Sequence, residues 1–89
     1  MENAIRMTKR EKAAERLLSK PSDFSWAELA PLMQGFGYEL KKTGGSGRKF
    51  IHAQTGATLF MHEPYPGKIL KAYQVREAIR FLRQEGHLK

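Results

Sequence analysis

Between residues 38 and 62 the chain alternates polar and apolar side chains, and two short turn sequences interrupt the alternation. A period of two is typical of β-strands that bury one face. The turns are the glycine-rich residues 43–47 and residues 53–56, which end in glycine. Strands joined by such short turns pair antiparallel, so we expect a meander of consecutive hairpins. The predicted strands cover residues 38–42, 48–52 and 57–62.

Helical periodicity precedes and follows this region. Two capping-box patterns, Thr8 with Glu11 and Ser25 with Glu28, each come before apolar residues at a spacing of three or four. A third apolar stripe stops near Gly86. The predicted helices cover residues 9–19, 25–34 and 72–84. The element order α-α-β-β-β-α predicts an α+β fold, a three-stranded antiparallel sheet with helices on one face.

The four-residue turn 53–56 also predicts how the second and third strands pair. It places Phe50 opposite Leu59 and Gly47 opposite His62, and facing residues share one side of the sheet. The side expected to cover the helices carries Tyr38, Leu40, Phe50, Leu59 and Met61. The other face would carry Lys41, Lys49, Ile51, Thr58, Phe60 and His62. Basic residues beside an exposed aromatic suit a nucleic acid. The alternative is an ordinary exposed face or a contact between copies.

Composition limits the classes of function. The chain has 89 residues, enough for one small domain, and 16 Lys and Arg against 9 Asp and Glu give a formal net charge of +7. Such a charge favours a polyanionic partner such as RNA or DNA, and less often an anionic membrane or an acidic protein. The absence of cysteine excludes disulfides and thiolate chemistry and fits a reducing cytoplasm. With no apolar run of membrane-spanning length and no signal-peptide pattern, we expect a cytoplasmic protein without a membrane partner.

The cationic residues of the second half form three groups. One belongs to the predicted hairpin, one flanks the loop before the last helix, and one forms a stripe along that helix. The arginine fork suits phosphate geometry, although a charged stripe can also be a solvated helix face. We expect the three groups to form one continuous RNA-binding surface. Its residues are Lys41, Lys42, Arg48, Lys49, Lys68, Lys71, Arg76, Arg80 and Arg83.

No CxxC, HExxH, P-loop or GxSxG motif is present, and we expect neither a metal nor another cofactor. The remaining titratable candidates are His52, His62 and His87. Histidine beside cationic side chains suits metal-independent RNA cleavage, in which a general base removes the 2′-hydroxyl proton. Alternatively, His52 and His62 each close the end of a strand. His87 lies near the C-terminus, where we expect it to be solvated.

Several stretches resemble the HicA-type toxins of bacterial toxin–antitoxin systems. They are Trp26-Ala-Glu-Leu, Gly35-Phe-Gly-Tyr, Gly45-Ser-Gly-Arg-Lys-Phe-Ile-His and Thr58-Leu-Phe-Met-His-Glu-Pro-Tyr-Pro-Gly-Lys. The resemblance implies a fold similar to double-stranded RNA-binding domains, mRNA cleavage without a metal, and neutralisation by a HicB-type antitoxin. Residues 1–22 are then an N-terminal helical extension, and residues 23–89 form the RNA-binding domain.

In the family that the chain resembles, the catalytic histidine directly follows Gly-Ser, and Gly47 holds that position here. Because the predicted pairing places His62 across from Gly47, we predict His62 as general base and His52 as the second candidate. Three functions stay open: an mRNA endoribonuclease, a catalytically silent module that binds RNA or an antitoxin, and a protein-binding domain whose charge keeps it soluble. The predicted phosphate contacts nearest the reaction are Arg48, Lys49 and Arg76.

Overall fold

The computed structural model describes residues 8–89, so the first seven residues of the predicted extension lie outside it. All six predicted elements are present, each with bounds within two residues of the prediction. The sheet is antiparallel throughout, in the order β1-β2-β3. The α+β prediction is therefore confirmed. The elements are α1 (Lys9–Leu18), α2 (Trp26–Gly35), β1 (Tyr38–Gly44), β2 (Gly47–His52), β3 (Thr58–His62) and α3 (Ala72–Gln84).

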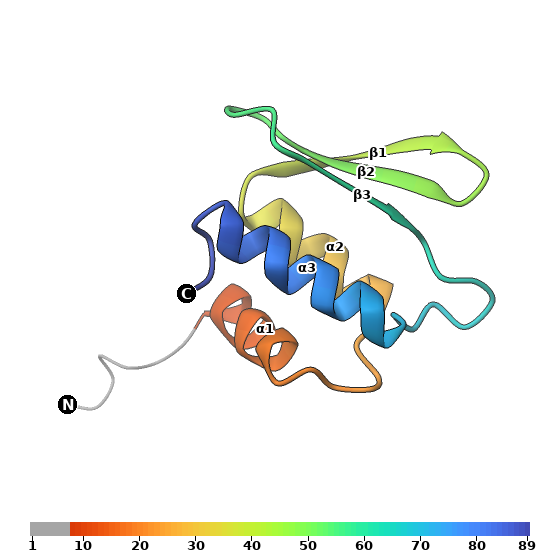
Figure 1. Cartoon of the computed structure of the whole chain (residues 1–89), viewed down its shortest axis with the longest axis horizontal. Helices are drawn as coiled ribbons and strands as arrows, with labels where there is room; N and C mark the ends of the chain where they lie inside the picture. Colours follow the sequence, from red (N-terminus) through yellow and green to blue (C-terminus); the bar gives the residue numbers. More distant parts are fainter. Residues whose placement is uncertain (1–7) are drawn as a thin grey trace.

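The elements form layers (Figure 1). The sheet is one layer, α2 and α3 lie against one of its faces, and α1 lies on the far side of these helices from the sheet. Within residues 8–89 no element covers the opposite face of the sheet. That uncovered surface, called here the outer face, is therefore open to a partner.

Local sequence signals explain the ends of the helices. The side chains of Thr8 and Ser25 each accept a hydrogen bond from the backbone N–H three residues later, and the Glu11 and Glu28 carboxylates accept one from the backbone N–H of the cap residue. Both capping boxes read from the sequence are thus confirmed. Gly37, with a φ of +102°, ends α2 in a conformation that favours glycine.

The core lies between the sheet and the helices. Phe50 is completely buried, and Trp26 from α2 packs against it with ring centroids 5.4 Å apart. Tyr38, Leu59 and Met61 are buried on the same side of the sheet. The predicted division of the sheet into a core face and an outer face is confirmed, because a period of two sends alternate residues to opposite sides.

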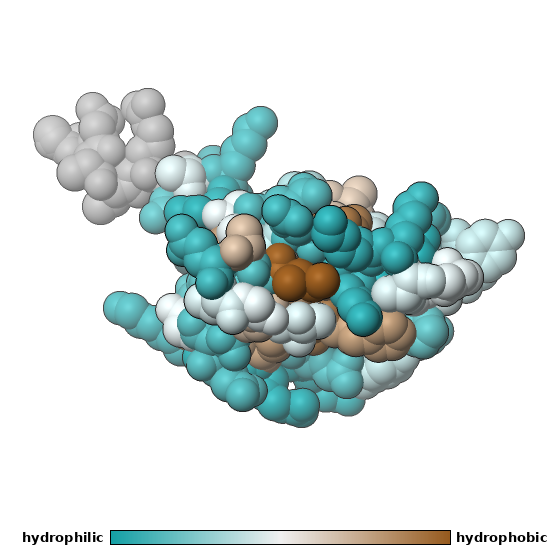
Figure 2. Space-filling model, turned by 90° about the horizontal axis from the view of Figure 1, so that it is seen from above, coloured by the Kyte–Doolittle hydropathy of each residue, from teal (hydrophilic) through white to brown (hydrophobic). Residues whose placement is uncertain are grey.

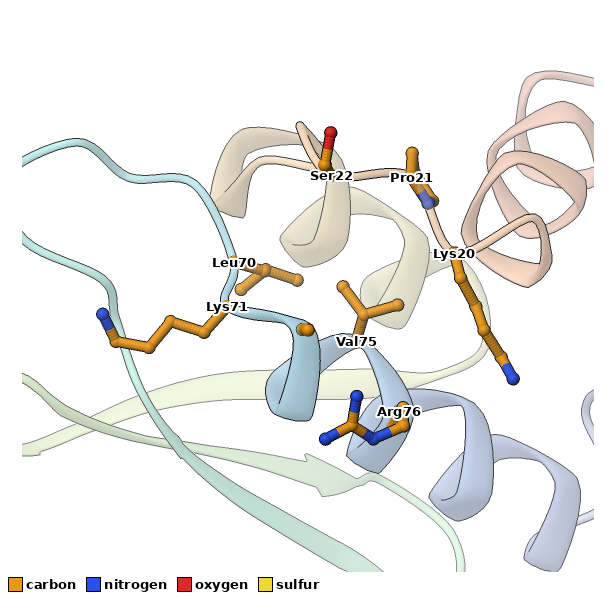
Figure 3. A pocket seen from close by; sticks show the side chains of 8 residues that line it. Lys20, Pro21, Ser22, Leu70, Lys71, Val75 and Arg76 are labelled. Carbon is orange, nitrogen blue, oxygen red and sulfur yellow. The ribbon is translucent and has the colours of Figure 1, made fainter.

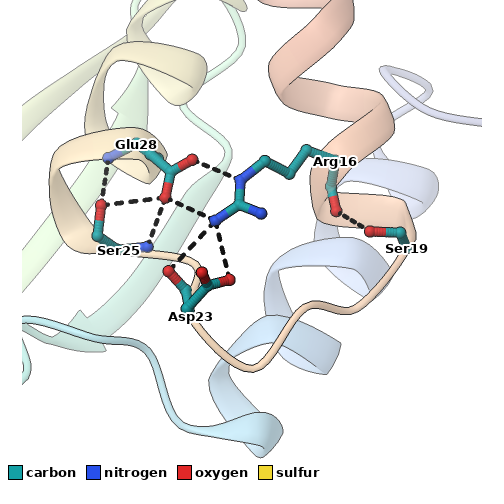
Figure 4. A network of polar contacts seen from close by, with 5 residues as sticks. All are labelled: Arg16, Ser19, Asp23, Ser25 and Glu28. Atoms are coloured by element: carbon teal, nitrogen blue, oxygen red, sulfur yellow. Dashed lines mark hydrogen bonds and ion pairs between the residues drawn. The ribbon is translucent and has the colours of Figure 1, made fainter.

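Helix α1 shares this core. Leu17 is completely buried. On the surface, Arg16 donates hydrogen bonds to both carboxylate oxygens of Glu28, at 2.6 and 3.2 Å, and to Asp23 at 3.0 Å (Figure 4). These bonds, the ones to Glu28 foremost, raise the pKa of Arg16, and the bond from Arg16 lowers the pKa of Glu28 to about 2. The network fixes α1 against the start of α2.

Candidate nucleic-acid interface

The pairing of β2 and β3 confirms the predicted register. Gly47 lies opposite His62, and Lys49 lies opposite Phe60. Lys41 of β1 lies opposite Lys49 on its other side. The outer face therefore carries one row across the sheet made of Lys41, Lys49 and Phe60. The next row along the strands ends in His62. Diagonal neighbours across a ladder are about 7–8 Å apart, which sets the spacing between Lys49 and His62.

His62 is exposed at the end of β3, and one side chain orients its ring. Its Nδ1 lies 3.0 Å from the Ser46 hydroxyl, and its ring meets Phe60 edge to face at 5.2 Å. When Nδ1 donates to the Ser46 oxygen, Nε2 carries the free lone pair. Nε2 has no hydrogen-bond partner within residues 8–89. The arrangement can therefore hold a base whose acceptor atom faces outward.

Two lysines face each other beside this histidine. Lys41 lies 3.6 Å from the Glu39 carboxylate, and Lys49 makes no ion pair with any described residue. Like charges placed directly opposite each other destabilise a sheet. Phe60 next to them keeps 48% of its surface exposed. An anion that bridges the two ammonium groups would relieve their repulsion, while the phenyl ring offers a surface for a base to stack on.

Gly47 is buried, and neighbouring side chains fill the space that a side chain at this position would need. A Cβ atom at this position would lie 2.3 Å from the Thr43 hydroxyl oxygen and 3.3 Å from the nearest ring carbons of Phe60. Thr43 occupies a register shift of β1 between Lys42 and Gly44, which directs it toward this space. The position that the family resemblance gives to a histidine therefore holds no side chain here, and His62 lies directly across from it.

A buried amide connects the candidate base to α3. Gln74 is 3% exposed and is the only buried polar side chain within residues 8–89. Its Nε2 donates to the His62 carbonyl oxygen at 2.9 Å, and its Oε1 accepts from the Lys71 backbone N–H at 2.9 Å. Sequence reasoning missed Gln74 and Ser46. The third position of a helix is a known capping position, which is the one signal that pointed to Gln74.

His52 lies on the helix-facing side of the sheet, and backbone groups occupy both of its ring nitrogens. Nε2 lies 3.1 Å from the Phe36 carbonyl oxygen, to which it can donate. Nδ1 is 3.1 and 3.2 Å from the N–H groups of Gln54 and Thr55, from which it accepts. A histidine held in this way ties the 53–56 turn to the end of α2.

The prediction that the His87 side chain is solvated is wrong. It is half-buried, stacks on Phe36 with centroids 4.9 Å apart, and its Nε2 lies 3.0 Å from the Tyr38 hydroxyl. Burial, followed by the proximity of His52, lowers the pKa of His87. The cause is that the chain after α3 turns back onto the core. The position of His87 near the C-terminus gives no signal of this turn.

Glu63 engages two of the predicted phosphate contacts. Arg48 lies on the helix-facing side, opposite Met61, and its Nε is 3.0 Å from the Glu63 carboxylate. Its Nη1 also donates to the carbonyl of Gly45 at 3.0 Å. Lys68 binds the other carboxylate oxygen, and its hydrogen bond, with the charge of Arg48, lowers the pKa of Glu63. These contacts brace the hairpin turn against the loop before α3.

The prediction of a single cationic surface is wrong, because the cations lie in three places. Lys41 and Lys49 lie on the outer face, whereas Lys42 pairs with Arg48 on the other side of the sheet. Figure 2 shows the mostly hydrophilic outer face with a small hydrophobic centre. The remaining predicted contacts lie on or beside α3, where they line two hollows. They are Lys71, Arg76, Arg80 and Arg83.

Two further observations concern residues 8–89. No three His, Cys, Asp or Glu side chains gather there in a way that could hold a metal ion. None of the helices combines the length and the apolar composition needed to cross a bilayer.

A comparison with protein families gives one match. The family model described as the HicA toxin of bacterial toxin–antitoxin matches residues 26–86, which is more than half of the chain. The match begins at the first residue of α2 and ends two residues after α3. No curated protein and no solved structure matches the chain.

Proposed function

The chain belongs to the HicA toxin family of bacterial toxin–antitoxin systems, and from this premise we propose that it is a metal-independent mRNA endoribonuclease with His62 as general base. The observation that carries the proposal is the pairing of His62 with Gly47 on an uncovered sheet face. An imidazole at either position reaches the same space, since opposed Cβ atoms are about 4.5–5.5 Å apart. His52 does not enter the proposal, because both of its nitrogens are engaged.

The proposed reaction uses groups of the outer face. Nε2 of His62 takes the proton of a ribose 2′-hydroxyl, and the 2′-oxygen attacks the adjacent phosphorus. Lys49 and Lys41 stabilise the negative charge that develops on the phosphorane. The bond to the 5′-oxygen breaks, and that oxygen takes a proton from water. The products are a 2′,3′-cyclic phosphate and a 5′-hydroxyl end, and His62 then returns its proton to solvent.

Cleavage of RNA by the purified full chain in the presence of a chelator tests the proposal. His62→Ala should slow cleavage by about 10²–10⁴-fold, the usual contribution of a general base. His87→Gln is the matched control, because it removes a histidine that packs on Phe36 away from the outer face. Full activity of His62→Ala would contradict the assignment. Cyclic phosphate ends on the products would support the reaction type.

The second candidate is a silent module that binds RNA or the antitoxin, and Gly47 at the position of the family histidine favours it. The discriminating variant is Gly47→His combined with Thr43→Ala, since the Thr43 hydroxyl blocks a Cβ at position 47. Thr43→Ala alone is its control. If the wild-type chain leaves RNA intact and the double variant cleaves it, the binding function replaces the enzymatic one.

The proposal extends to the partner and the compartment. A toxin of a toxin–antitoxin system requires neutralisation, and we propose a HicB-type antitoxin that covers the outer face in the cytoplasm. Expression of the chain alone should arrest growth, and co-expression with an antitoxin encoded beside it should restore growth. Growth arrest that persists when that neighbour is co-expressed would contradict the partner assignment.

A further inference from the structure

Two adjacent hollows lie between α3 and the connection from α1 to α2, and Figure 3 shows the first of them. One has a volume of about 350 Å³ and the other about 270 Å³, and Lys20 and Arg76 line both. They therefore form one continuous depression, called here the α3 groove. Leu70, Val75 and Ile79 contribute its apolar lining. Its cationic residues are Lys20, Lys71, Arg76, Arg80 and Arg83.

The charges of the α3 groove are not balanced by acids. No Asp or Glu lines either hollow, and within residues 8–89 none of the five cations pairs with an Asp or Glu side chain, although Arg83 Nε donates to the Lys89 main-chain oxygen at 2.8 Å. By contrast, Arg16 and Arg48 are both ion-paired. Five cations held together without acids repel one another, so an anionic ligand would stabilise the groove.

Both walls of the groove are fixed. The Leu70 N–H donates to the Phe24 carbonyl at 2.8 Å, which joins the segment before α3 to the segment before α2. Lys20 follows α1 with a φ of +54°, a left-handed conformation that favours glycine. Figure 3 shows its side chain and that of Arg76 on the facing wall, with the two charged ends extending in different directions. Lys20 lies outside the family match, so this wall belongs to the N-terminal extension.

We propose that the α3 groove binds the sugar–phosphate chain of single-stranded RNA as a second contact apart from His62. The inference rests on the proposed function, which supplies RNA as the ligand. Tyr73 lines neither hollow, but it favours RNA over an acidic peptide, because it is 50% exposed and lies one turn before the groove residue Arg76 on α3. An exposed aromatic beside arginines is a stacking platform for bases.

The position of the groove allows one RNA strand to reach both contacts. Lys71 lines the groove at the start of α3, and its backbone N–H binds Gln74. The same Gln74 side chain holds the His62 carbonyl at 2.9 Å. The end of the groove and the end of β3 are thus joined through a single residue. An RNA cleaved beside His62 can continue over this junction into the groove.

The salt dependence of RNA affinity tests the inference. The probe is a labelled single-stranded RNA with 2′-O-methyl riboses, which lack the attacking hydroxyl and stay intact whichever residue is the base, and the protein is the full chain. Lys20→Gln with Arg76→Gln should reduce the slope of log affinity against log salt by about 1.4, since each lost phosphate contact removes about 0.7. Lys9→Gln with Lys12→Gln is the matched control, because it removes the same charge from an exposed part of α1.

Substitution of the aromatic residue separates stacking from charge. Tyr73→Ala should weaken RNA binding about tenfold, and Tyr73→Phe should bind as the parent does. Thermal unfolding of each variant verifies that the fold is retained. A loss of affinity only in Tyr73→Ala supports a groove that binds nucleotides rather than any polyanion.

Three results would change the conclusions. Equal slopes for the groove pair and the α1 control pair would overturn the inference while leaving His62-dependent cleavage in place. Binding of a glutamate-rich peptide that depends on Lys20, without such binding of RNA, would also overturn it and assign the groove to an acidic protein. If the groove effect is found but His62→Ala cleaves at the wild-type rate, the groove stands and the proposed catalytic site fails.

Discussion

Replacement of Gln74 by methionine tests whether one buried amide holds the candidate base in place. Methionine has nearly the same length and volume, so the substitution leaves no large cavity. It removes both hydrogen bonds of the amide, the one to the His62 carbonyl and the one from the Lys71 N–H. Any loss of stability then reports on the polar contacts rather than on packing.

The size of the effect follows from the surroundings of Gln74. A buried polar group that loses its partner costs about 1–3 kcal/mol. His62 and Lys71 are exposed residues, so water can partly replace the lost bonds, and we take the low end for each. The expected loss is about 2 kcal/mol in the free energy of unfolding, which corresponds to about 8–16 °C in Tm for a domain of this size.

Urea unfolding of Gln74→Met against wild type measures this loss, and cleavage kinetics measure its effect on the site. If Gln74 positions His62, kcat should fall while KM changes little, because no RNA-binding side chain is replaced. Gln74→Glu adds a second comparison, since it keeps the acceptor for Lys71 and loses the donor for the His62 carbonyl. A methionine variant within about 0.5 kcal/mol of wild type would refute the reasoning, because that is the range of neutral surface substitutions.

Three further outcomes follow from the same structure. Leu17→Ala should cost about 2–5 kcal/mol in a single urea transition, because Leu17 is completely buried in the shared core; two transitions would show that α1 folds separately. The bond from Arg16 lowers the pKa of Glu28 from 4.5 to about 2, so its stabilisation is complete above pH 4.5 and is lost toward pH 2. Arg16→Gln should reduce the pH dependence of the free energy of unfolding over that range. A pH dependence equal to that of the wild type would contradict the pairing. Burial lowers the pKa of His87 below 6.5, so stability should fall as the pH drops below about 6.5, and His87→Gln should remove that dependence in urea titrations from pH 5 to 8.

The fold followed from local patterns because each element carries its own signal. The period of two and the 53–56 turn were enough to place Gly47 opposite His62, since a short turn fixes the register of the hairpin it closes. The capping residues Thr8 and Ser25 marked the starts of α1 and α2 for a similar reason. In each case the interacting groups are near in sequence or related by the pleat.

The parts of the site that sequence reasoning missed depend on contacts between distant segments. Glu63 reaches Arg48 and Lys68 because the loop after β3 returns beside the hairpin turn, and no periodicity encodes that return. His52 is engaged by the end of α2 for the same kind of reason. The prediction from charge alone grouped Arg48 and Lys68 with the lysines of the outer face. The pleat of the sheet and the loop after β3 place them elsewhere.

The residues around His62 explain how a chain with glycine at position 47 can still place an imidazole on this part of the outer face. Thr43 enters this space through the register shift of β1, and its hydroxyl lies 2.3 Å from where a Cβ of residue 47 would stand. A histidine at 47 and Thr43 in this position therefore exclude each other. The histidine that does fit comes from the opposite strand, where Ser46 orients Nδ1 and Gln74 holds the backbone. Glycine at 47, the shifted threonine and the oriented His62 are thus parts of one local arrangement, in which a histidine placed at position 47 should displace the Thr43 hydroxyl.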